Sequence, residues 1–315
     1  MQKKIALIFP GQGSQKIGMG KNFHDNFSSA REVFQEIDEV LGQNLSRLIF
    51  TGEISELTKT ENTQPALMAV SLAILASLLS ETKKNIQEIA NYAAGHSLGE
   101  YSALAAAKSL SIASTAKILK IRGEAMRDAG AKTKGAMAAI IGTDYDTAQK
   151  IVAAAAENDI CQIANDNSIG QIVISGHQEA IARAISLGKE FGAKKVIALP
   201  VSGAFHSELV REAAEKVASA LAGLPVNKPI IPIVTNVTAQ PEDKPEYLKE
   251  LLVKQVTGSV RWRETIIKLK NIGVTDIIEV GSGKVLSGLV KRIEPELNIS
   301  NIEEPQDLDN FLKNY

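Results

Sequence analysis

Residues 95–99, Gly-His-Ser-Leu-Gly, match the G-x-S-x-G pattern of a nucleophile elbow. An apolar run precedes them and a helix-forming stretch follows, so Ser97 is expected at a sharp strand-to-helix turn. Such a turn lifts the hydroxyl out of the chain path, and the next backbone amide, from Leu98, then faces an oxyanion at a helix N-terminus. Short patterns also arise by chance in a chain of 315 residues, but this context favours a nucleophilic serine.

A serine nucleophile needs a base, and the chain has four histidines. His24 lies in an amphipathic stretch and His177 at a predicted helix start, where solvation is the more typical role. His96 adjoins the serine but points elsewhere at a sharp turn, so we expect it to pack or hydrogen-bond within the site. His206 precedes a predicted helix where the chain returns toward its main part, and it is the candidate base. Its local sequence fits a histidine near a helix cap equally well.

A second glycine loop, Phe9–Gln15, follows the first predicted strand. It does not match the dinucleotide motif, because Lys16 stands where the third glycine is needed, and no G-K-[ST] sequence completes a P-loop. Loops at the carboxyl ends of strands in α/β sheets lie where ligands bind. An amide of this loop is therefore a candidate second oxyanion donor, and a flexible turn is the alternative.

Arg122 interrupts a predicted amphipathic helix. The apolar spacing around it does not decide which face of the helix it occupies. Because most helical arginines are solvated, the local pattern alone favours a surface position.

The elements that must position these residues alternate between short β-rich runs and helical patterns, which predicts an α/β fold with a largely parallel sheet. The expected strands are Ile5–Phe9, Tyr92–Ala94, Ile230–Thr235 and Thr275–Val280. The expected helices include Ser29–Leu41, Pro65–Leu79, Glu100–Lys108, Ser111–Met126 and Glu208–Leu221.

The middle of the chain shows a different order, βαββαβ, which predicts a ferredoxin-like subdomain with its own small sheet. Its expected elements are Met137–Ile141, Asp146–Glu157, Cys161–Ala164, Gln171–Ser175, Gln178–Phe191 and Lys195–Leu199. We expect residues 129–199 to form this insert, and residues 1–128 and 200–315 to form the two parts of the large α/β domain.

The amino-acid composition excludes several classes of protein. With 44% hydrophobic and 23% charged residues the chain is neither disordered nor fibrous. The 35 Lys and Arg residues against 36 Asp and Glu leave no basic field for nucleic acid or an anionic membrane. The apolar stretch Ala66–Leu79 is shorter than the roughly 18 residues of a membrane span and predicts a buried helix. The single cysteine, Cys161, lies in a strand pattern, is expected to be buried, and fits a reducing cytoplasm.

Seven segments stand in order along the chain: Phe9–Gln15, Thr63–Ala66, Gly95–Tyr101, Arg122–Gly123, Asn167–Gln171, Gly203–Ser207 and Leu252–Val256. Taken together, they resemble the malonyl-CoA:acyl-carrier-protein transacylases of fatty-acid synthesis, over essentially the whole chain. Their order and spacing also fit the family. One departure is Ile169, which stands where the family pattern has proline, and it affects a loop rather than the chemistry.

The resemblance implies a hydrolase-like large domain with a ferredoxin-like insert, and it implies roles for single residues. Ser97 is the implied nucleophile, His206 its base, and the amides of Gln12 and Leu98 are the oxyanion donors. Arg122 is the implied partner of the malonyl carboxylate, and the backbone carbonyl of Gln255 accepts a hydrogen bond that orients His206. His96 and Phe205 are expected to line the substrate site. The implied reaction moves a malonyl group from malonyl-CoA to the phosphopantetheine thiol of acyl carrier protein through a malonyl-serine, with no metal or redox cofactor. The ring of Phe205 is expected to disfavour an α-methyl branch.

Two other classes remain open. A serine esterase or thioesterase of the α/β-hydrolase class would need an acid between Ser97 and His206. The candidates all fall within the predicted insert: Asp144, Asp146, Asp159 and Asp166. A non-catalytic docking module would not need an intact Ser97, His206 and Arg122.

An acidic carrier protein would be expected to bind a surface with local positive charge. Candidate residues are Lys189, Lys194, Lys195, Arg261, Arg263 and Lys268. A solvated surface of mixed charge accounts for these residues at least as well.

Overall fold

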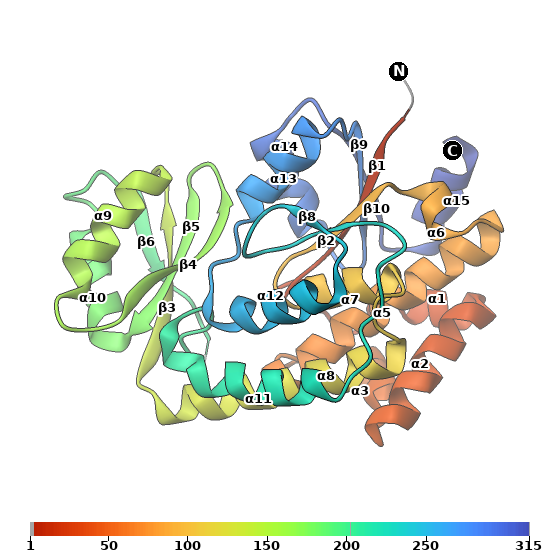
Figure 1. Cartoon of the computed structure of the whole chain (residues 1–315), viewed down its shortest axis with the longest axis horizontal. Coiled ribbons are helices and arrows are strands. Elements are labelled where there is room, and N and C mark those ends of the chain that lie inside the picture. Colours follow the sequence, from red (N-terminus) through yellow and green to blue (C-terminus); the bar gives the residue numbers. More distant parts are fainter. Residues whose placement is uncertain (1–2, 202, 315) are drawn as a thin grey trace.

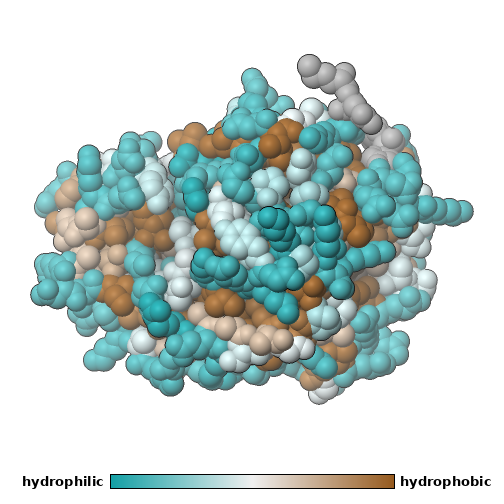
Figure 2. Space-filling model, in the orientation of Figure 1, coloured by the Kyte–Doolittle hydropathy of each residue, from teal (hydrophilic) through white to brown (hydrophobic). Residues whose placement is uncertain are grey.

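The computed structural model describes residues 3–201 and 203–314, which are organised around two sheets (Figure 1). A six-stranded sheet has the order β10-β9-β1-β2-β7-β8, and a four-stranded sheet has the order β4-β5-β3-β6. The smaller sheet and its helices lie at the left of Figure 1, beside the larger sheet. On the face shown in Figure 2, hydrophilic side chains cover most of the surface, and hydrophobic ones form separate patches.

Parallel pairing dominates the larger sheet. Its strands are β1 (Ile5–Phe9), β2 (Tyr92–Gly95), β7 (Ile233–Val234), β8 (Pro241–Glu242), β9 (Asp276–Val280) and β10 (Asn298–Ile302). Only β8 pairs antiparallel, with β7. Because β1, β2 and β7 run in the same direction, the loops after their carboxyl ends meet at one edge of the sheet, which is where α/β proteins bind ligands.

Helices cover both faces of this sheet, and the alternation along β1 shows how. Ile5, Leu7 and Phe9 point into one core, whereas Ala6 and Ile8 point into the other. The first core includes residues of α2 (Ser28–Leu41), α5 (Thr60–Thr82), α7 (Leu98–Ala106), α8 (Ile112–Lys132), α11 (Arg211–Ala222) and α12 (Pro245–Thr257). The second is closed by α13 (Trp262–Asn271) and α14 (Val285–Ile293).

Shorter helices complete the larger part. They are α1 (Lys21–Asn26), α3 (Leu45–Thr51), α4 (Ile54–Leu57), α6 (Ile86–Ile89), α15 (Pro305–Asn314) and a single 3-10 turn, η1 (Glu208–Val210). Of these, only η1 falls in a predicted element, as the start of one continuous helix expected from Glu208.

Helix α5 begins earlier than predicted. It starts at Thr60 and carries Pro65 in its interior, because the polar residues ahead of the proline are also buried in the fold. The helix is long and apolar enough to cross a membrane by length and composition alone, but 83% of its most apolar window is buried inside the protein. This burial identifies it as a core helix.

The smaller part follows the predicted order of elements. It comprises β3 (Gly135–Ile141), α9 (Tyr145–Ala156), β4 (Cys161–Ser168), β5 (Gln171–His177), α10 (Gln178–Leu187) and β6 (Lys195–Ala198). All its strand pairings are antiparallel. Cys161 is buried in its core, as expected, and burial raises the pKa of its thiol to about 11.

Long helices connect the two parts. Helix α8 leads into the smaller part, α11 leads back, and the two pack together (Figure 1). Because α8 continues to Lys132, the expected boundary before residue 129 falls within a helix.

Two predicted elements are four residues shorter than expected. The strand expected over Ile230–Thr235 is only Ile233–Val234, because a proline at 232 has no N–H to donate to a neighbouring strand. The helix expected to reach Phe191 ends at Leu187, where Gly188 follows.

Candidate active site

Ser97 stands between β2 and α7 with φ 52° and ψ −110°, a backbone conformation that is strained for any residue other than glycine. The flanking glycines make this turn possible. A Cβ atom at Gly95 would lie 1.9 Å from the carbonyl oxygen of Gly99, and one at Gly99 would lie 2.3 Å from that of Phe9. The G-x-S-x-G pattern therefore corresponds to a turn in which helix, strand and neighbouring loop touch backbone to backbone.

His206 contacts the serine through its Nε2 atom, 2.8 Å from Ser97 Oγ. Its Nδ1 atom lies 2.8 Å from the carbonyl oxygen of Gln255 and 3.1 Å from that of Gly258. Carbonyl oxygens only accept hydrogen bonds, so Nδ1 carries the hydrogen and Nε2 is free to accept the serine proton. Burial, reinforced by the positive charge of Arg122, lowers the pKa of His206 to about 3, which keeps the imidazole neutral.

Arg122 is buried beside the serine, so the surface position favoured by its local pattern is wrong. Its Nη1 donates to Gln64 Oε1 at 2.7 Å, and its Nη2 donates to Ser97 Oγ at 3.1 Å and to Gln255 Oε1 at 3.0 Å. Each of these acceptors is neutral, so the guanidinium keeps its positive charge next to the nucleophile. Such an arrangement favours an anionic substrate group.

The backbone of Ser97 is held by side chains from two other segments. Its N–H donates to Asn236 Oδ1 at 2.8 Å, and its carbonyl accepts from Gln255 Nε2 at 3.0 Å. Asn236 also donates from Nδ2 to the carbonyl of Gly95 at 2.7 Å. Asn236 was not among the predicted site residues, although its position just after β7, at the edge where the strand ends meet, is a signal that could have found it.

These residues surround a cavity of about 130 Å³. Its lining contains every predicted site residue except Gln255: Gln12, His96, Ser97, Leu98, Arg122, Phe205 and His206. Gln255 lies behind the cavity, in contact with both Arg122 and His206. The remaining lining residues, none of which had a predicted role, are Gln64, Met126, Met137, Asn165, Val173, Leu199 and Val201.

His96 packs and hydrogen-bonds within the site, as expected. Its Nε2 lies 2.8 Å from Asn167 Oδ1, and its ring meets the Trp262 ring edge-on with centroids 5.7 Å apart. Burial lowers its pKa, so it is neutral. Phe205 is buried next to His206.

The four aspartates that a hydrolase triad could use do not serve His206, because two backbone carbonyls occupy its Nδ1. Asp166 instead pairs with Arg263 at 2.8 Å, and Asp159 pairs with Arg183 at 2.6 Å. Asp144 accepts a hydrogen bond from the backbone of Thr147 and caps α9. This geometry disfavours an esterase with a Ser-His-Asp triad.

The basic residues considered for carrier-protein docking fall into two groups. Arg263 pairs with the buried Asp166, and Arg261 pairs with Glu264. Lys189, Lys194 and Lys195 are exposed on the smaller part, and Lys268 on α13 is partly exposed. Their role in docking stays a prediction.

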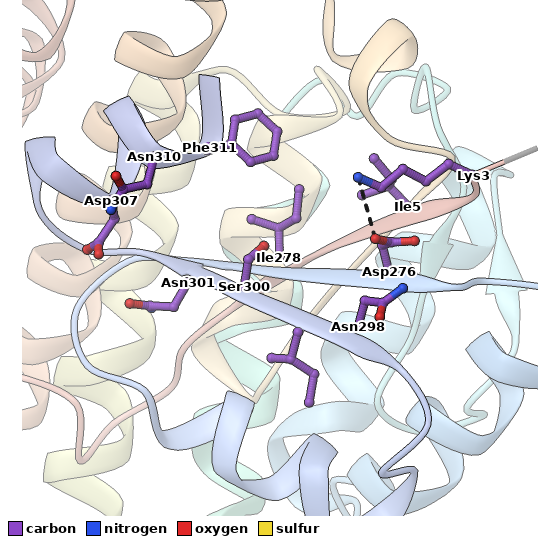
Figure 3. A pocket seen from close by; sticks show the side chains of 11 residues that line it. Lys3, Ile5, Asp276, Ile278, Asn298, Ser300, Asn301, Asp307, Asn310 and Phe311 are labelled. Atoms are coloured by element: carbon purple, nitrogen blue, oxygen red, sulfur yellow. Dashed lines mark ion pairs between the residues drawn. The ribbon is translucent and has the colours of Figure 1, made fainter. Parts of the chain in front are cut away.

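A separate cavity, of about 270 Å³, lies between β1, β9, β10 and α15 (Figure 3). Lys3 and Asp276 form an ion pair of 3.5 Å at its edge. Figure 3 shows Asn298 and Ser300 along β10 and Phe311 from α15 on its walls. None of the predicted site residues lines this cavity.

Residues 6–295 match the family model of the acyl transferase domain. The chain is 44% identical over 307 residues to the malonyl CoA-acyl carrier protein transacylase of Bacillus subtilis (strain 168), covering 97% of this chain and 95% of that protein. The crystal structure of an acyl-carrier-protein S-malonyltransferase from Bartonella henselae superposes with a TM-score of 0.95, at 45% identity and with 98% of each chain covered. A malonyl-transacylase in complex with a type II PKS acyl-carrier protein gives a TM-score of 0.94 at 37% identity, covering 99% of this chain and 100% of that chain.

Proposed function

The chain belongs to the acyl transferase family that includes the malonyl CoA-acyl carrier protein transacylases, and we propose that it moves a malonyl group from malonyl-CoA to the thiol of acyl carrier protein. The observation that carries this proposal is the pairing of a nucleophile and a buried cation. Arg122 Nη2 lies 3.1 Å from Ser97 Oγ, and its acceptors are neutral. A carboxylate two carbons from a thioester carbonyl fits a site with these two groups side by side.

The first half-reaction acylates the enzyme. His206 takes the Ser97 proton at Nε2 as Oγ attacks the thioester carbonyl of malonyl-CoA. The amides of Gln12 and Leu98 stabilise the oxyanion, and one such donor is worth roughly 2.7–4 kcal/mol in comparable sites. The carbon–sulfur bond then breaks, and protonated His206 returns the proton to the CoA sulfur, which leaves malonyl-Ser97.

The second half-reaction reverses these steps with a different thiol. The phosphopantetheine thiol of acyl carrier protein enters after CoA leaves, and His206 takes its proton. The sulfur attacks the serine ester, the Ser97 oxygen leaves, and His206 protonates it. The route is ping-pong, and the carbonyl oxygen of Gln255 keeps the imidazole in one tautomer throughout.

Substrate choice follows from two side chains. Arg122 can pair both oxygens of the malonyl carboxylate with its planar fork, whereas an acetyl group leaves the guanidinium without an anion. Phe205 is buried beside His206 and disfavours an α-methyl branch such as that of methylmalonyl-CoA. A serine esterase is the less favoured function, because His206 has carbonyl partners rather than a carboxylate.

The remaining expectations belong to the same proposal. Serine and histidine chemistry suffices for acyl transfer, so no metal or redox cofactor is needed, and neither nucleic acid nor a membrane is a partner. The expected location is the cytoplasm. We describe the larger part, residues 1–128 and 200–315, as hydrolase-like and residues 129–199 as ferredoxin-like; the βαββαβ order and the antiparallel pairing support the second description.

The test is to incubate the protein separately with malonyl-CoA, acetyl-CoA and methylmalonyl-CoA and to read the covalent adduct by intact mass. We expect a malonyl adduct and little or no adduct from the other two thioesters. Equal labelling by acetyl-CoA would contradict the role of Arg122 in selectivity.

A further inference from the structure

Glu100 is a buried acid to which the transfer mechanism gives no role. It lies in the first turn of α7, directly after the nucleophile elbow, and only 1% of its surface is exposed. Its Oε2 atom accepts hydrogen bonds from the backbone N–H of Asn236 at 3.0 Å and from Gln255 Nε2 at 2.8 Å. A buried carboxylate is costly unless its surroundings stabilise it, so these two bonds identify what holds Glu100 in place.

Both partners of Glu100 also hold the strained backbone of Ser97. Asn236 accepts from the Ser97 N–H, and Gln255 donates to the Ser97 carbonyl. A positive φ at a serine persists only where the surroundings fix it. Glu100 therefore hydrogen-bonds to both residues whose side chains hold the Ser97 backbone, through the backbone N–H of Asn236 and the side chain of Gln255.

Glu100 also helps to determine which way the Gln255 amide faces, in the same sense as the Ser97 carbonyl, which accepts from the same Nε2 atom. An ionised carboxylate can only accept hydrogen bonds, so the nitrogen end of the amide must face Glu100. The oxygen end then faces Arg122, whose Nη2 donates to it at 3.0 Å. With the amide reversed, its N–H groups would oppose the N–H groups of the guanidinium. A protonated Glu100 could donate as well as accept, so its own contribution to this selection would be lost, and the Ser97 carbonyl and Arg122 would be left to hold the amide.

We propose that ionised Glu100 is a positioning residue that fixes the Gln255 amide and thereby holds Arg122 and the Ser97 backbone ready for a malonyl group, an inference that rests on the proposed function. The environment of Glu100 makes its charge variable near neutral pH. Burial raises its pKa to about 7, while its hydrogen bonds to Asn236 and Gln255 and the charge of Arg122 act in the opposite direction. Glu100 is thus ionised above about pH 7 and protonated below it.

The other titratable groups around Glu100 do not change charge in that range. Arg122 from α8 is a permanent cation. Burial raises the pKa of Tyr101, the next residue on α7, to about 12, and that of His206 is lowered to about 3, so both stay neutral. The other elements packed on α7 add little: β1 and β7 carry no titratable side chain, β2 carries only Tyr92, its first residue, and Glu61 of α5 pairs with Arg127. On α12, Lys254 and Glu250 pair with each other at 2.5 Å.

The test measures the rate at which malonyl-CoA acylates the enzyme, by rapid quench and intact mass, at pH values on both sides of 7. Acylation alone is followed, so the acceptor thiol does not contribute. For the wild type we expect the rate to fall by about tenfold or more below pH 7, the scale of one charge-assisted hydrogen bond. Glu100→Gln cannot ionise and should keep the low-pH rate at every pH. Glu250→Gln, which removes an exposed acid from the helix that carries Gln255, should keep the wild-type profile.

Acetyl-CoA separates positioning from general damage to the fold. It brings no carboxylate to Arg122, so Glu100→Gln should slow its acylation less than that by malonyl-CoA. An equal loss with both thioesters would make Glu100 a structural residue and overturn the inference.

Two further outcomes would also overturn it. A flat pH profile in the wild type would show that the charge of Glu100 does not matter, and this result needs no variant that has to fold. If the acylation rate of Glu100→Gln still fell at low pH, the titration of another group, such as a phosphate of CoA, would cause the fall. The absence of any malonyl adduct on the wild type would instead overturn the proposed function.

Discussion

The two sheets of the molecule contribute to the site in opposite ways. The larger sheet and its helices supply the hydrogen-bonded groups around the nucleophile: Ser97, Arg122, His206, Asn236 and Gln255. The smaller sheet contributes cavity walls, with Met137 from β3, Asn165 from β4 and Val173 from β5. The groups proposed to react are thus anchored in the larger part, and the smaller part shapes the space in front of them.

This division has a physical reason. The carboxyl ends of parallel strands bring several loops to one edge, so polar groups distant in sequence meet there. An antiparallel sheet offers a smooth face of alternate side chains instead. Hydrogen bonds join the two parts: the backbone N–H of Asp166 in the smaller part donates to the carbonyl of Val260 in the larger part at 2.9 Å. Changes in the larger part should therefore affect chemistry and the choice of acyl group, and changes in the smaller part should affect mainly the packing of the cavity wall.

The largest effect is expected for Ser97→Ala. It removes the attacking oxygen without removing packed atoms, so no malonyl adduct should form while the fold stays intact. Intact mass after incubation with malonyl-CoA measures the adduct, and circular dichroism checks the fold. A normal adduct on this variant would mean that another residue is the nucleophile.

The next largest effect is expected for His206→Ala. Losing a positioned base usually costs 10²–10⁴-fold in rate, so acylation should slow by roughly that factor with Ser97 still present. Single-turnover acylation by malonyl-CoA measures the loss. A loss of less than about tenfold would require another base.

Arg122→Ala should separate substrates rather than abolish catalysis. Losing one partner of a buried, hydrogen-bonded charge pair costs about 2–5 kcal/mol, so malonyl transfer should fall by roughly 30- to 4,000-fold. Acetyl transfer should hold or rise, because no charge is lost and the pocket becomes easier to desolvate. The ratio of the two kcat/KM values is the quantity to compare. If both substrates lose equally, Arg122 is structural.

The smallest effect is expected for Met137→Ala, a change in the wall contributed by the smaller sheet. Met137 is buried, so the free energy of unfolding should fall by about 2–5 kcal/mol, the usual cost of such a truncation. The malonyl-to-acetyl ratio of kcat/KM should stay within about threefold of the wild-type value, because Arg122, which distinguishes the two substrates, belongs to the larger part. A threefold change corresponds to less than about 1 kcal/mol. Thermal unfolding and paired kinetics measure the two effects. A larger change in the ratio would contradict the division between the two parts.

The sequence alone identifies some residues of the site and not others. Ser97 could be identified because a turn of this kind needs glycines on both sides, and His206 because few histidines compete with it. Arg122 could not be identified from its own helix, since apolar spacing does not reveal that a cation is buried against Gln64 and Gln255. Its role and that of Gln255 were expected only from the family resemblance.

The elements show a similar limit. Central strand β1 is apolar throughout and was predicted to the residue. Edge strand β10, Asn-Ile-Ser-Asn-Ile, is mostly polar, breaks the polar–apolar alternation at Ser300 and Asn301, and depends on pairing with β9, so its local composition does not indicate a strand. Polar positioning residues such as Asn236 are equally invisible until the strands that precede them are placed side by side.

One measurement tests transfer through a malonyl-serine most directly. The enzyme is acylated with malonyl-CoA, freed of CoA by rapid gel filtration, and mixed with phosphopantetheinylated acyl carrier protein while both proteins are followed by intact mass. We predict that the malonyl mass leaves the enzyme and appears on the carrier protein at the same rate. Loss of the malonyl group to water as malonate, with the carrier protein left unlabelled, would contradict the proposed transferase and favour a serine esterase.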